Sequence, residues 1–366
     1  MAKLYSSPSA DGFYMPAEYE KHHGTILIWP VRPGSWGNDP SNAQEAFCKI
    51  ITELSKNETV YLLTDKDHLE EVKRKVKNNA VILEIPSNDS WARDVAPTFV
   101  TNKQTIRGIN WKFNAWGGEF DGLYSHWELD DKVASLFCEN TGKDYYDFGN
   151  FVLEGGSIHT DGEGTLLVTK SCLLSKGRNP ELTMSEIEST LKDALNVSKV
   201  LWLPYGIYND ETNEHVDNVC CFTSACNVVL AWTDNQNDPQ YKMSLADYEY
   251  LQNQTDAKGR KIIIHKLPIP DVPVCISDED MDYTFEEGED TRQVGERLAA
   301  SYVNFYFGNN IVLVPQFGGE NKASDKRAID ILTDLCKDRK VIGIDSTAIL
   351  LGGGNIHCIT QQIPFC

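Results

Sequence analysis

The chain has 366 residues, of which 41% are hydrophobic, enough for a substantial core. Its 34 Lys and Arg are outnumbered by 54 Asp and Glu, which gives a net charge of −20 at pH 7. This balance argues against binding to the phosphate backbone of a nucleic acid, and it would attract small cations.

The ten cysteines are scattered along the chain, without a CxxC pair or the Cys/His spacing of a zinc site. Neither a disulfide framework nor a structural metal site is therefore expected. The first residues lack the apolar segment of a signal peptide, and no run of about 18 apolar residues occurs. We expect a cytoplasmic protein with free thiols and no membrane partner.

Predicted strands and helices alternate along the chain. Residues 1–23 have little periodicity and are expected to form an arm over the surface. Thr25 to Trp29 is an apolar run ended by proline, which predicts a buried strand, and apolar residues at helical spacing predict a helix over 42–56. Further strands are predicted at 60–63, 81–85, 144–148, 199–203, 261–267 and 340–344, and further helices at 65–77, 130–141, 183–194, 245–254 and 323–337.

An internal repeat favours one domain, although length alone would suggest two or three. Residues 153–159 (LEGGSIH) align with 351–357 (LGGGNIH), glycine pair on glycine pair and Ile-His on Ile-His. Residues 94–100, 215–222 and 301–307 share the general form of a polar residue at a strand entrance followed by a hairpin. Repeated units of this size bury their apolar faces against one another.

Each unit also contains a hairpin, as at 160–164 and 308–310, which a doubly wound parallel sheet would not contain. We therefore expect residues 1–366 to form a single domain, a ring of five mixed α/β units with the helices outside. Equivalent loops of such a ring point to one end of its axis. That arrangement would bring six side chains together: Asp94, Glu154, His215, Asp217, Asn304 and Cys358.

Residues 268–295 form the longest stretch without a strong pattern, and two interpretations of it remain open. The stretch contains nine acidic residues: Asp271, Asp278, Glu279, Asp280, Asp282, Glu286, Glu287, Glu289 and Asp290. It is either a solvated surface loop or an acidic lid over the site.

Cys358 follows a run of glycines and is a candidate nucleophile, although cysteine is also a common core residue. His215 occupies the equivalent position in another unit, and on a strand it would share a face with Asp217. Cysteine and histidine together form a nucleophile and acid/base pair. A thiol pKa of about 8.5 leaves little thiolate at neutral pH, so a neighbouring positive charge is needed.

Three carboxylates accompany this pair: Asp94, Glu154 and Asp217. In a cysteine protease or acyl transferase they would oppose thiolate formation and repel an oxyanion. They suit a cationic substrate instead, because a guanidinium presents a planar fork of N–H donors to carboxylates. The bound cation would itself favour the thiolate. Each acid taken alone could equally be a helix cap or a surface ion pair.

Five separated motifs resemble those of a known family. They are residues 89–94 (DSWARD), 153–157 (LEGGS), 176–180 (KGRNP), 214–218 (EHVDN) and 352–358 (GGGNIHC). In this order they closely resemble the agmatine deiminases, within the bacterial-type peptidylarginine deiminase family of guanidino-group-modifying enzymes. The resemblance extends from near Gly12 to the C-terminus.

This resemblance implies a five-bladed, pseudosymmetric α/β propeller of ββαβ-type repeats around a central active-site channel. It also implies hydrolysis of agmatine to N-carbamoylputrescine and ammonia, without a metal or organic cofactor, in a homo-oligomer that is a dimer or a tetramer. By position the family's nucleophile, acid/base, two guanidinium clamps and third carboxylate match, in that order, Cys358, His215, Asp94, Asp217 and Glu154. Ala96 departs from the glycine that usually precedes the proline of the first motif.

Other functions of the same scaffold remain open. Deimination of arginine or peptidylarginine would use the same covalent amidino-cysteine, and so would an amidinotransferase that passes the group to an amine. A non-catalytic polyamine or guanidine sensor would bind the same cations without releasing a product. Ammonia release and product analysis separate these possibilities.

The far end of the substrate distinguishes agmatine from arginine, because only arginine has a carboxylate there. A desolvated carboxylate would need a basic partner. Near the motifs only Arg93 and Arg178 occur, and on an extended backbone Arg93 would point away from Asp94. The sequence therefore favours agmatine.

Acidic residues are more frequent at this end of the predicted site. Asp210, Glu211 and Glu214 precede His215 and could receive the distal ammonium of agmatine, or could form an exposed acidic loop. Trp91 could form a wall beside the four-carbon chain. The glycine loop leaves its backbone open to close approach. We therefore expect substrate binding by Trp91, Asp94, Asp217, Glu211 and Gly352.

Overall fold

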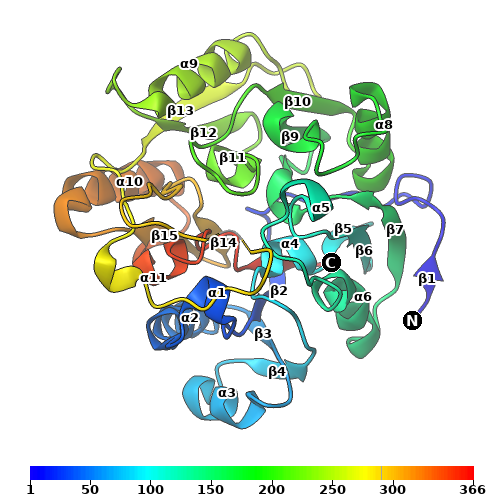
Figure 1. Ribbon diagram of the computed structural model, residues 1–366. Helices are drawn as coiled ribbons and strands as arrows, with labels where there is room; N and C mark the ends of the chain where they lie inside the picture. Colours follow the sequence, from blue (N-terminus) through cyan, green and yellow to red (C-terminus); the bar gives the residue numbers. More distant parts are fainter. Residues whose placement is uncertain (290) are drawn as a thin grey trace.

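Five separate mixed sheets surround a common centre in the computed structural model, which describes residues 1–289 and 291–366 (Figure 1). The longer helices lie outside the sheets, and short helices and loops occupy the middle of this view. Parallel and antiparallel pairs occur within the same sheets. The prediction of an α/β fold with mixed sheets is therefore confirmed.

Four of the sheets repeat the order strand, strand, helix, strand. A hairpin pairs the first two strands antiparallel, and the helix returns the chain so that the third strand lies parallel to the second. The four units are β5 (Thr98–Thr101), β6 (Ile106–Lys112), α6 (Asp130–Asn140) and β7 (Tyr145–Val152); β8 (His159–Thr160), β9 (Thr165–Thr169), α8 (Met184–Leu195) and β10 (Lys199–Leu203); β11 (Cys220–Ser224), β12 (Asn227–Trp232), α9 (Pro239–Leu251) and β13 (Ile263–Pro268); and β14 (Tyr306–Gly308), β15 (Ile311–Gln316), α10 (Lys322–Leu335) and β16 (Lys340–Asp345). The first sheet gains β1 (Lys3–Leu4), which pairs parallel with β7.

Both ends of the chain contribute to the fifth sheet. Its strand order is β17 (Gln361–Pro364), β2 (His22–Ile28), β3 (Thr59–Thr64) and β4 (Val81–Glu84). The last strand, β17, pairs antiparallel with β2, and the chain crosses from β2 to β4 through α2 (Ser41–Leu54) and α3 (Leu69–Val76). The strand predicted at Thr25 to Trp29 thus pairs directly with the last strand of the chain.

Short helices and turns shape the loops between these strands. They are α1 (Pro33–Trp36), α4 (Ala92–Val95), α5 (Gly118–Asp121), α7 (Lys170–Leu173), α11 (Thr347–Leu350), and the 3₁₀ turns η1 (Gly155–Ser157), η2 (Val216–Asn218), η3 (Asp278–Asp280) and η4 (Gly319–Asn321). Several of them carry the polar residues that the sequence singled out.

Local signals define most of the long helices. The apolar residues of α2, from Ala43 to Leu54, repeat at helical spacing and are buried. Thr183 begins α8 in a capping box with Glu186. Helix α9 begins before the predicted residue 245, because Asp238 caps it and a proline occupies its first turn.

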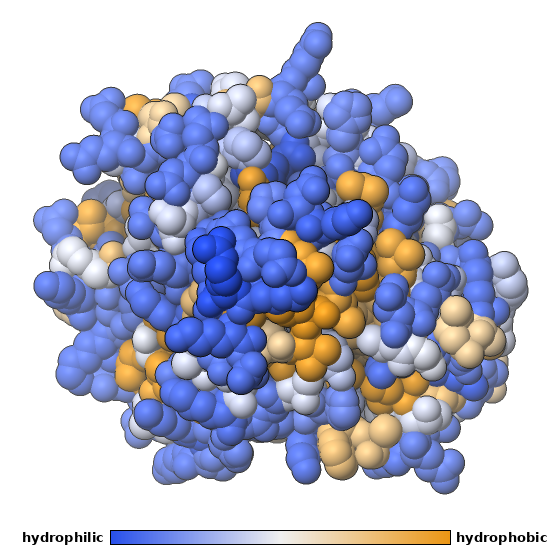
Figure 2. Space-filling model, turned by 90° about the horizontal axis from the view of Figure 1, so that it is seen from below, coloured by the Kyte–Doolittle hydropathy of each residue, from blue (hydrophilic) through white to orange (hydrophobic). Residues whose placement is uncertain are grey.

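The surface is mainly hydrophilic on the face that Figure 2 shows, with apolar residues in smaller groups between the polar ones. In the described part of the chain no helix combines the length and the apolar character needed to cross a membrane.

Three local predictions are wrong. Residues 1–23 are not confined to the surface, because Phe13 and Glu18 are buried. His215 and Asp217 lie at the start of and within the turn η2 rather than on a strand, so strand alternation does not set their directions. Arg93 lies on the helical turn α4 rather than on extended backbone, and its side chain is buried.

Candidate functional site

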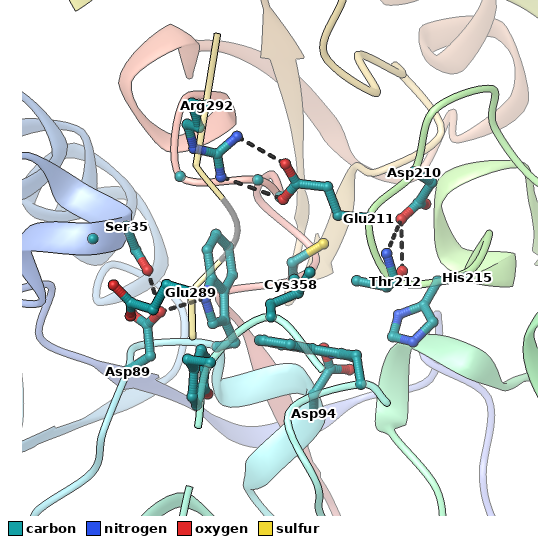
Figure 3. A pocket seen from close by; sticks show the side chains of 18 of the residues that line it. Ser35, Asp89, Asp94, Asp210, Glu211, Thr212, His215, Glu289, Arg292 and Cys358 are labelled. Carbon is teal, nitrogen blue, oxygen red and sulfur yellow. Dashed lines mark hydrogen bonds and ion pairs between the residues drawn. The ribbon is translucent and has the colours of Figure 1, made fainter. Parts of the chain in front are cut away.

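A cavity of ≈ 460 Å³ lies among loops from several of the sheets. Seven of the predicted residues line it: Trp91, Asp94, Glu211, His215, Asp217, Gly352 and Cys358. Figure 3 shows Asp94, His215 and Cys358 around the same space, reached from different parts of the chain. The structure therefore brings together most of the residues that the motifs indicated, whereas Glu154 and Asn304 lie behind the lining.

Cys358 is held at the cavity by the loop between α11 and β17. Asn304 donates from Nδ2 to the Cys358 Sγ over 3.2 Å, and Sγ lies 3.8 Å from Asp217 Oδ2. Burial raises the pKa of the Cys358 thiol well above its usual value, and the Asp217 and Asp94 carboxylates raise it further. The site alone therefore holds a neutral thiol, and a cation beside the sulfur would favour the thiolate.

Two glycines of the repeated motif permit this close packing. A Cβ on Gly354 would lie 2.6 Å from Trp91 Cζ3 and 3.2 Å from Cys358 Sγ. A Cβ on Gly156 would lie 2.6 Å from His215 Nδ1. A side chain at either position would displace a group of the cavity. Steric crowding therefore explains why glycine occupies both positions.

Asp94 is fixed by two hydrogen bonds. Its Oδ2 accepts from Trp116 Nε1 over 2.9 Å, and its Oδ1 accepts from the Gly156 backbone N–H over 2.8 Å. Burial raises the pKa of Asp94 to about 6, with His215 opposing the rise and the Asp217 carboxylate adding to it. Asp94 therefore changes charge at a higher pH than an ordinary aspartate.

Of the two carboxylate oxygens of Asp217, one accepts a hydrogen bond and the other has no partner among the described residues. Its Oδ2 accepts from His357 Nδ1 over 2.7 Å. Its Oδ1 is buried and has no hydrogen-bond partner among residues 1–289 and 291–366. Burial would raise the pKa of Asp217, but the hydrogen bond and charge of His357 outweigh it and lower the pKa. Asp217 lines the cavity, and its Oδ1 remains an ionised acceptor without a partner in the described part of the chain, which suits an N–H donor of a ligand.

We expect kcat/KM for a cationic substrate to fall as the pH drops through about 6, where Asp94 takes up a proton. The loss of its charge weakens binding of the cation, and kcat/KM reports ionisations of the free enzyme. The check is a pH profile of kcat/KM for the wild type and Asp94→Asn. The variant should be much slower and should lack this acid limb, and an unchanged limb would rule Asp94 out as its source.

A buried ion pair lies behind His215. Glu154 Oε1 lies 2.8 Å from Arg178 Nε, and Glu154 Oε2 lies 3.7 Å from His215 Nε2. Burial lowers the pKa of His215, but Asp94, Cys172 and Glu154 outweigh it and raise the pKa well above its usual value. His215 is therefore an imidazolium that can give a proton to a group in the cavity.

Arg178→Ala should lower the free energy of unfolding by about 3–5 kcal/mol, because it leaves Glu154 as an unpaired buried charge. Both side chains of this pair are 0% exposed, and Arg178 also donates to the Thr212 backbone oxygen over 2.9 Å. Urea unfolding measures the loss. Arg327→Ala, which removes an exposed arginine from its pair with the exposed Asp271, is the matched control and should change stability little. Similar losses in the two variants would contradict the role of the buried pair.

The distal part of the cavity contains a cation that the sequence did not indicate. Arg292 donates from both Nη atoms to Glu211, over 2.9 and 3.3 Å (Figure 3). The expectation that Arg93 and Arg178 are the only nearby basic residues is therefore wrong. Burial raises the pKa of Glu211, and Arg292 offsets part of the rise. Trp91 lines the same space as predicted.

The stretch 268–295 divides into two parts. Glu289 and Arg292 line the cavity, and Glu289 also forms an ion pair with Arg32. The acidic residues at 278–282 are mostly exposed. Asp290 lies outside the described residues. The end of the stretch thus lines the cavity, whereas the acidic residues at 278–282 lie at the surface.

Among residues 1–289 and 291–366, two buried groups have ligand atoms close enough to hold a metal ion: Glu18, His159 and His357, and Glu154, Cys172 and His215. In the first group His357 already directs both ring nitrogens at carboxylates. In the second, Arg178 already neutralises Glu154. Internal ion pairs therefore account for both groups.

The family model for the Porphyromonas-type peptidyl-arginine deiminases matches residues 14–364. The chain belongs to this family. It is 55% identical over 365 residues to a protein of Selenomonas ruminantium named "Putative agmatine deiminase", with 98% of each chain covered. It is 49% identical over 366 residues to a protein of the same name from Latilactobacillus sakei, covering 100% of this chain and 99% of the other. Among solved structures, the agmatine deiminase of Enterococcus faecalis superposes with a TM-score of 0.96 at 42% identity, covering 100% of this chain and 99% of that one.

In this member of the Porphyromonas-type family, the motifs contain most of the predicted residues that line the cavity, but they did not reveal which groups hold the carboxylates in place. Trp116, Arg178 and His357 each bond one of the predicted carboxylates. Arg178 belongs to the motif at 176–180, and His357 belongs to the motif at 352–358, with its Ile-His pair repeated at 158–159. Trp116 lies in none of the motifs. The unusual Ala96 has φ −78° and ψ 163°, which any residue adopts, so it does not disturb the loop.

Proposed function

We propose that this chain hydrolyses the guanidinium group of agmatine to N-carbamoylputrescine and ammonia. The observation that carries the proposal is a neutral, half-buried thiol, Cys358, between the carboxylates Asp94 and Asp217 in a cavity of ≈ 460 Å³. This site would repel an anionic substrate, whereas a guanidinium would pair with the carboxylates and favour the thiolate at once. The names of the similar proteins agree with this choice.

The proposed reaction has two halves. Asp94 and Asp217 hold the guanidinium, the thiol loses its proton to solvent, and the Cys358 sulfur bonds to the central carbon. His215 gives its proton to one nitrogen, the C–N bond breaks and ammonia leaves, which gives an amidino-cysteine. Neutral His215 then takes a proton from water, the water oxygen bonds to the carbon, and the C–S bond breaks. The products are N-carbamoylputrescine and free Cys358.

The test is a substrate panel followed by ammonia release and mass spectrometry of the products. Agmatine should exceed arginine and an arginine peptide in kcat/KM by more than about tenfold, which corresponds to about 1.4 kcal/mol. A smaller ratio would contradict the substrate but not the chemistry. Products that incorporate added glycine or ornithine would indicate amidinotransfer, and binding without ammonia would indicate a sensor.

Glu211→Gln should raise the KM for agmatine more than it lowers kcat, as loss of ground-state binding does. The change also frees Arg292 from its carboxylate partner, so the kcat/KM of arginine relative to agmatine should rise. Glu296→Gln, which removes a carboxylate from the same lining, is the matched control. An equal change in substrate preference in both variants would show that Glu211 has no specific role.

We extend the proposal to the organisation of the chain. A closed five-bladed α/β propeller of ββαβ units, forming a single catalytic domain over residues 1–366, is supported by five sheets of similar topology and by the β17–β2 pair. Limited proteolysis that yields two stable halves would contradict it. A homo-oligomer, a dimer or a tetramer, rests on the family resemblance alone. A cytoplasmic location is supported by the ten free cysteines.

A further inference from the structure

A buried chain of alternating charges connects Asp217 to the N-terminal segment. His357 Nδ1 lies 2.7 Å from Asp217 Oδ2, and His357 Nε2 lies 2.6 Å from Glu18 Oε2. Arg93 Nη2 lies 3.3 Å from the same oxygen of Glu18. None of these four side chains is more than 4% exposed. Asp217, His357, Glu18 and Arg93 are called the charge chain below.

The hydrogen bonds of the charge chain require His357 to be an imidazolium. An ionised carboxylate only accepts, so a ring nitrogen that faces one must donate, and neutral imidazole has a single N–H. Glu18 is held ionised by Arg93 and by the Phe307 backbone N–H, 3.1 Å from Oε1. Burial and Arg93 lower the pKa of His357, but Glu18 and Asp217 outweigh them and raise it.

The equivalent histidine of the other motif copy is neutral. His159 lies with its ring centroid 6.2 Å from that of His357, and its Nδ1 accepts from the Phe222 backbone N–H over 3.3 Å. An imidazolium could not accept there. Burial lowers the pKa of His159 to about 4. Tyr306, whose ring also faces His357, stays uncharged because burial raises its pKa well above the usual value. The two histidines of the repeated motif therefore differ in charge: His357 is an imidazolium and His159 is neutral.

His357 also links Asp217 to the candidate nucleophile, because it directly precedes Cys358. Asn304 Oδ1 accepts from the His357 backbone N–H over 3.0 Å, while Asn304 Nδ2 donates to the Cys358 sulfur. One short segment thus carries the sulfur and fixes the carboxylate of Asp217, which comes from η2 beside a different sheet. The relative placement of two reacting partners strongly affects rate, since an error of about 1 Å can cost about 100-fold.

We propose that His357 is a positioning residue: its imidazolium, held by Glu18, keeps Asp217 ionised and turned so that Oδ1 is free for a guanidinium N–H. The identity of the bound group rests on the proposed function. With a neutral residue at 357, the buried carboxylates of Asp217 and Glu18 would lose the cation that lies between them. The Asp217 pKa would rise, and its orientation relative to the sulfur would be lost.

The first test measures protonation and needs no activity. At about pH 8 an ordinary histidine is neutral, whereas ¹⁵N NMR of histidine-labelled wild type should show protons on both ring nitrogens of His357. Glu18→Gln should leave a proton on only one ring nitrogen of His357, because the glutamine amide can donate a hydrogen bond to the other ring nitrogen. If only one ring nitrogen of His357 carries a proton in the wild type, the proposal is wrong. This result does not depend on which substrate the enzyme uses.

The second test measures positioning. His357→Asn keeps a donor but no charge, so kcat/KM should fall about 100-fold and the acid limb should move to higher pH as the Asp217 pKa rises. His159→Asn removes the same atoms from the other copy and should leave the pH profile unchanged. If both variants lose kcat/KM equally and the acid limb of the pH profile moves in neither, the proposal is overturned. If thermal scans show that His357→Asn is unfolded, the NMR result alone decides. Absence of ammonia release by the wild type would refute the proposed function and leave the NMR test valid.

Discussion

Cys358→Ala should abolish ammonia release from agmatine, with a loss in kcat of at least about 10⁴-fold, as for other enzymes that lose their nucleophile. The sulfur forms the covalent bond of the proposed intermediate, and an alanine methyl cannot replace it. Cys358 is half-buried and small, so its truncation should leave the fold intact by circular dichroism. Ammonia assays on purified protein measure the loss.

The matched control for this variant is Cys275→Ala. Cys275 is an exposed thiol that does not line the cavity, so its removal should leave turnover unchanged. If Cys358→Ala released ammonia at the rate of this control, the nucleophile assignment would fail.

His215→Ala should lower turnover by about 10²–10⁴-fold, because the departing ammonia and the attacking water both lose their proton-transfer partner. The informative readout is intact mass after agmatine is added. Wild type should return quickly to its free mass, whereas the variant should accumulate amidino-cysteine or fail to form it.

His68→Ala provides the comparison for His215. His68 is 37% exposed, pairs with Asp65 at the surface and does not line the cavity. Its variant should show wild-type turnover and no lasting adduct. Turnover of His215→Ala within about twofold of this control would be incompatible with an acid/base role, since such groups contribute much more.

Most of the predicted residues that line the cavity belong to short local motifs, and for this reason the sequence indicated them. Asp94 follows a tryptophan and an arginine in one stretch, and Cys358 follows its glycines in another. Such motifs reflect packing within a few residues, as the contact between Gly354 and Cys358 illustrates. The existence of most strands and helices was predictable for the same reason, since period and capping are local properties.

Other residues of the site were not predictable because they come from distant segments without a recognisable pattern. Glu18 lies in the stretch that looked like a surface arm, yet it is 3% exposed and bonds His357. Arg292 lies in the long acidic stretch, where one cation carries no signal among many acids. The turn at His215 was mistaken for a strand because a histidine and an aspartate two residues apart fit both conformations.

Because β17 pairs with β2, the sheet that contains β2 can be completed only after residues 361–364 have been synthesised. The loop with Cys358 directly precedes β17, so the candidate nucleophile is synthesised after the three carboxylates and His215. Closing contacts between the most distant segments is slow, and meanwhile the edge of β2 lacks its partner strand. A chain that lacked β17 would leave that edge open to the β17 strand of a neighbouring copy.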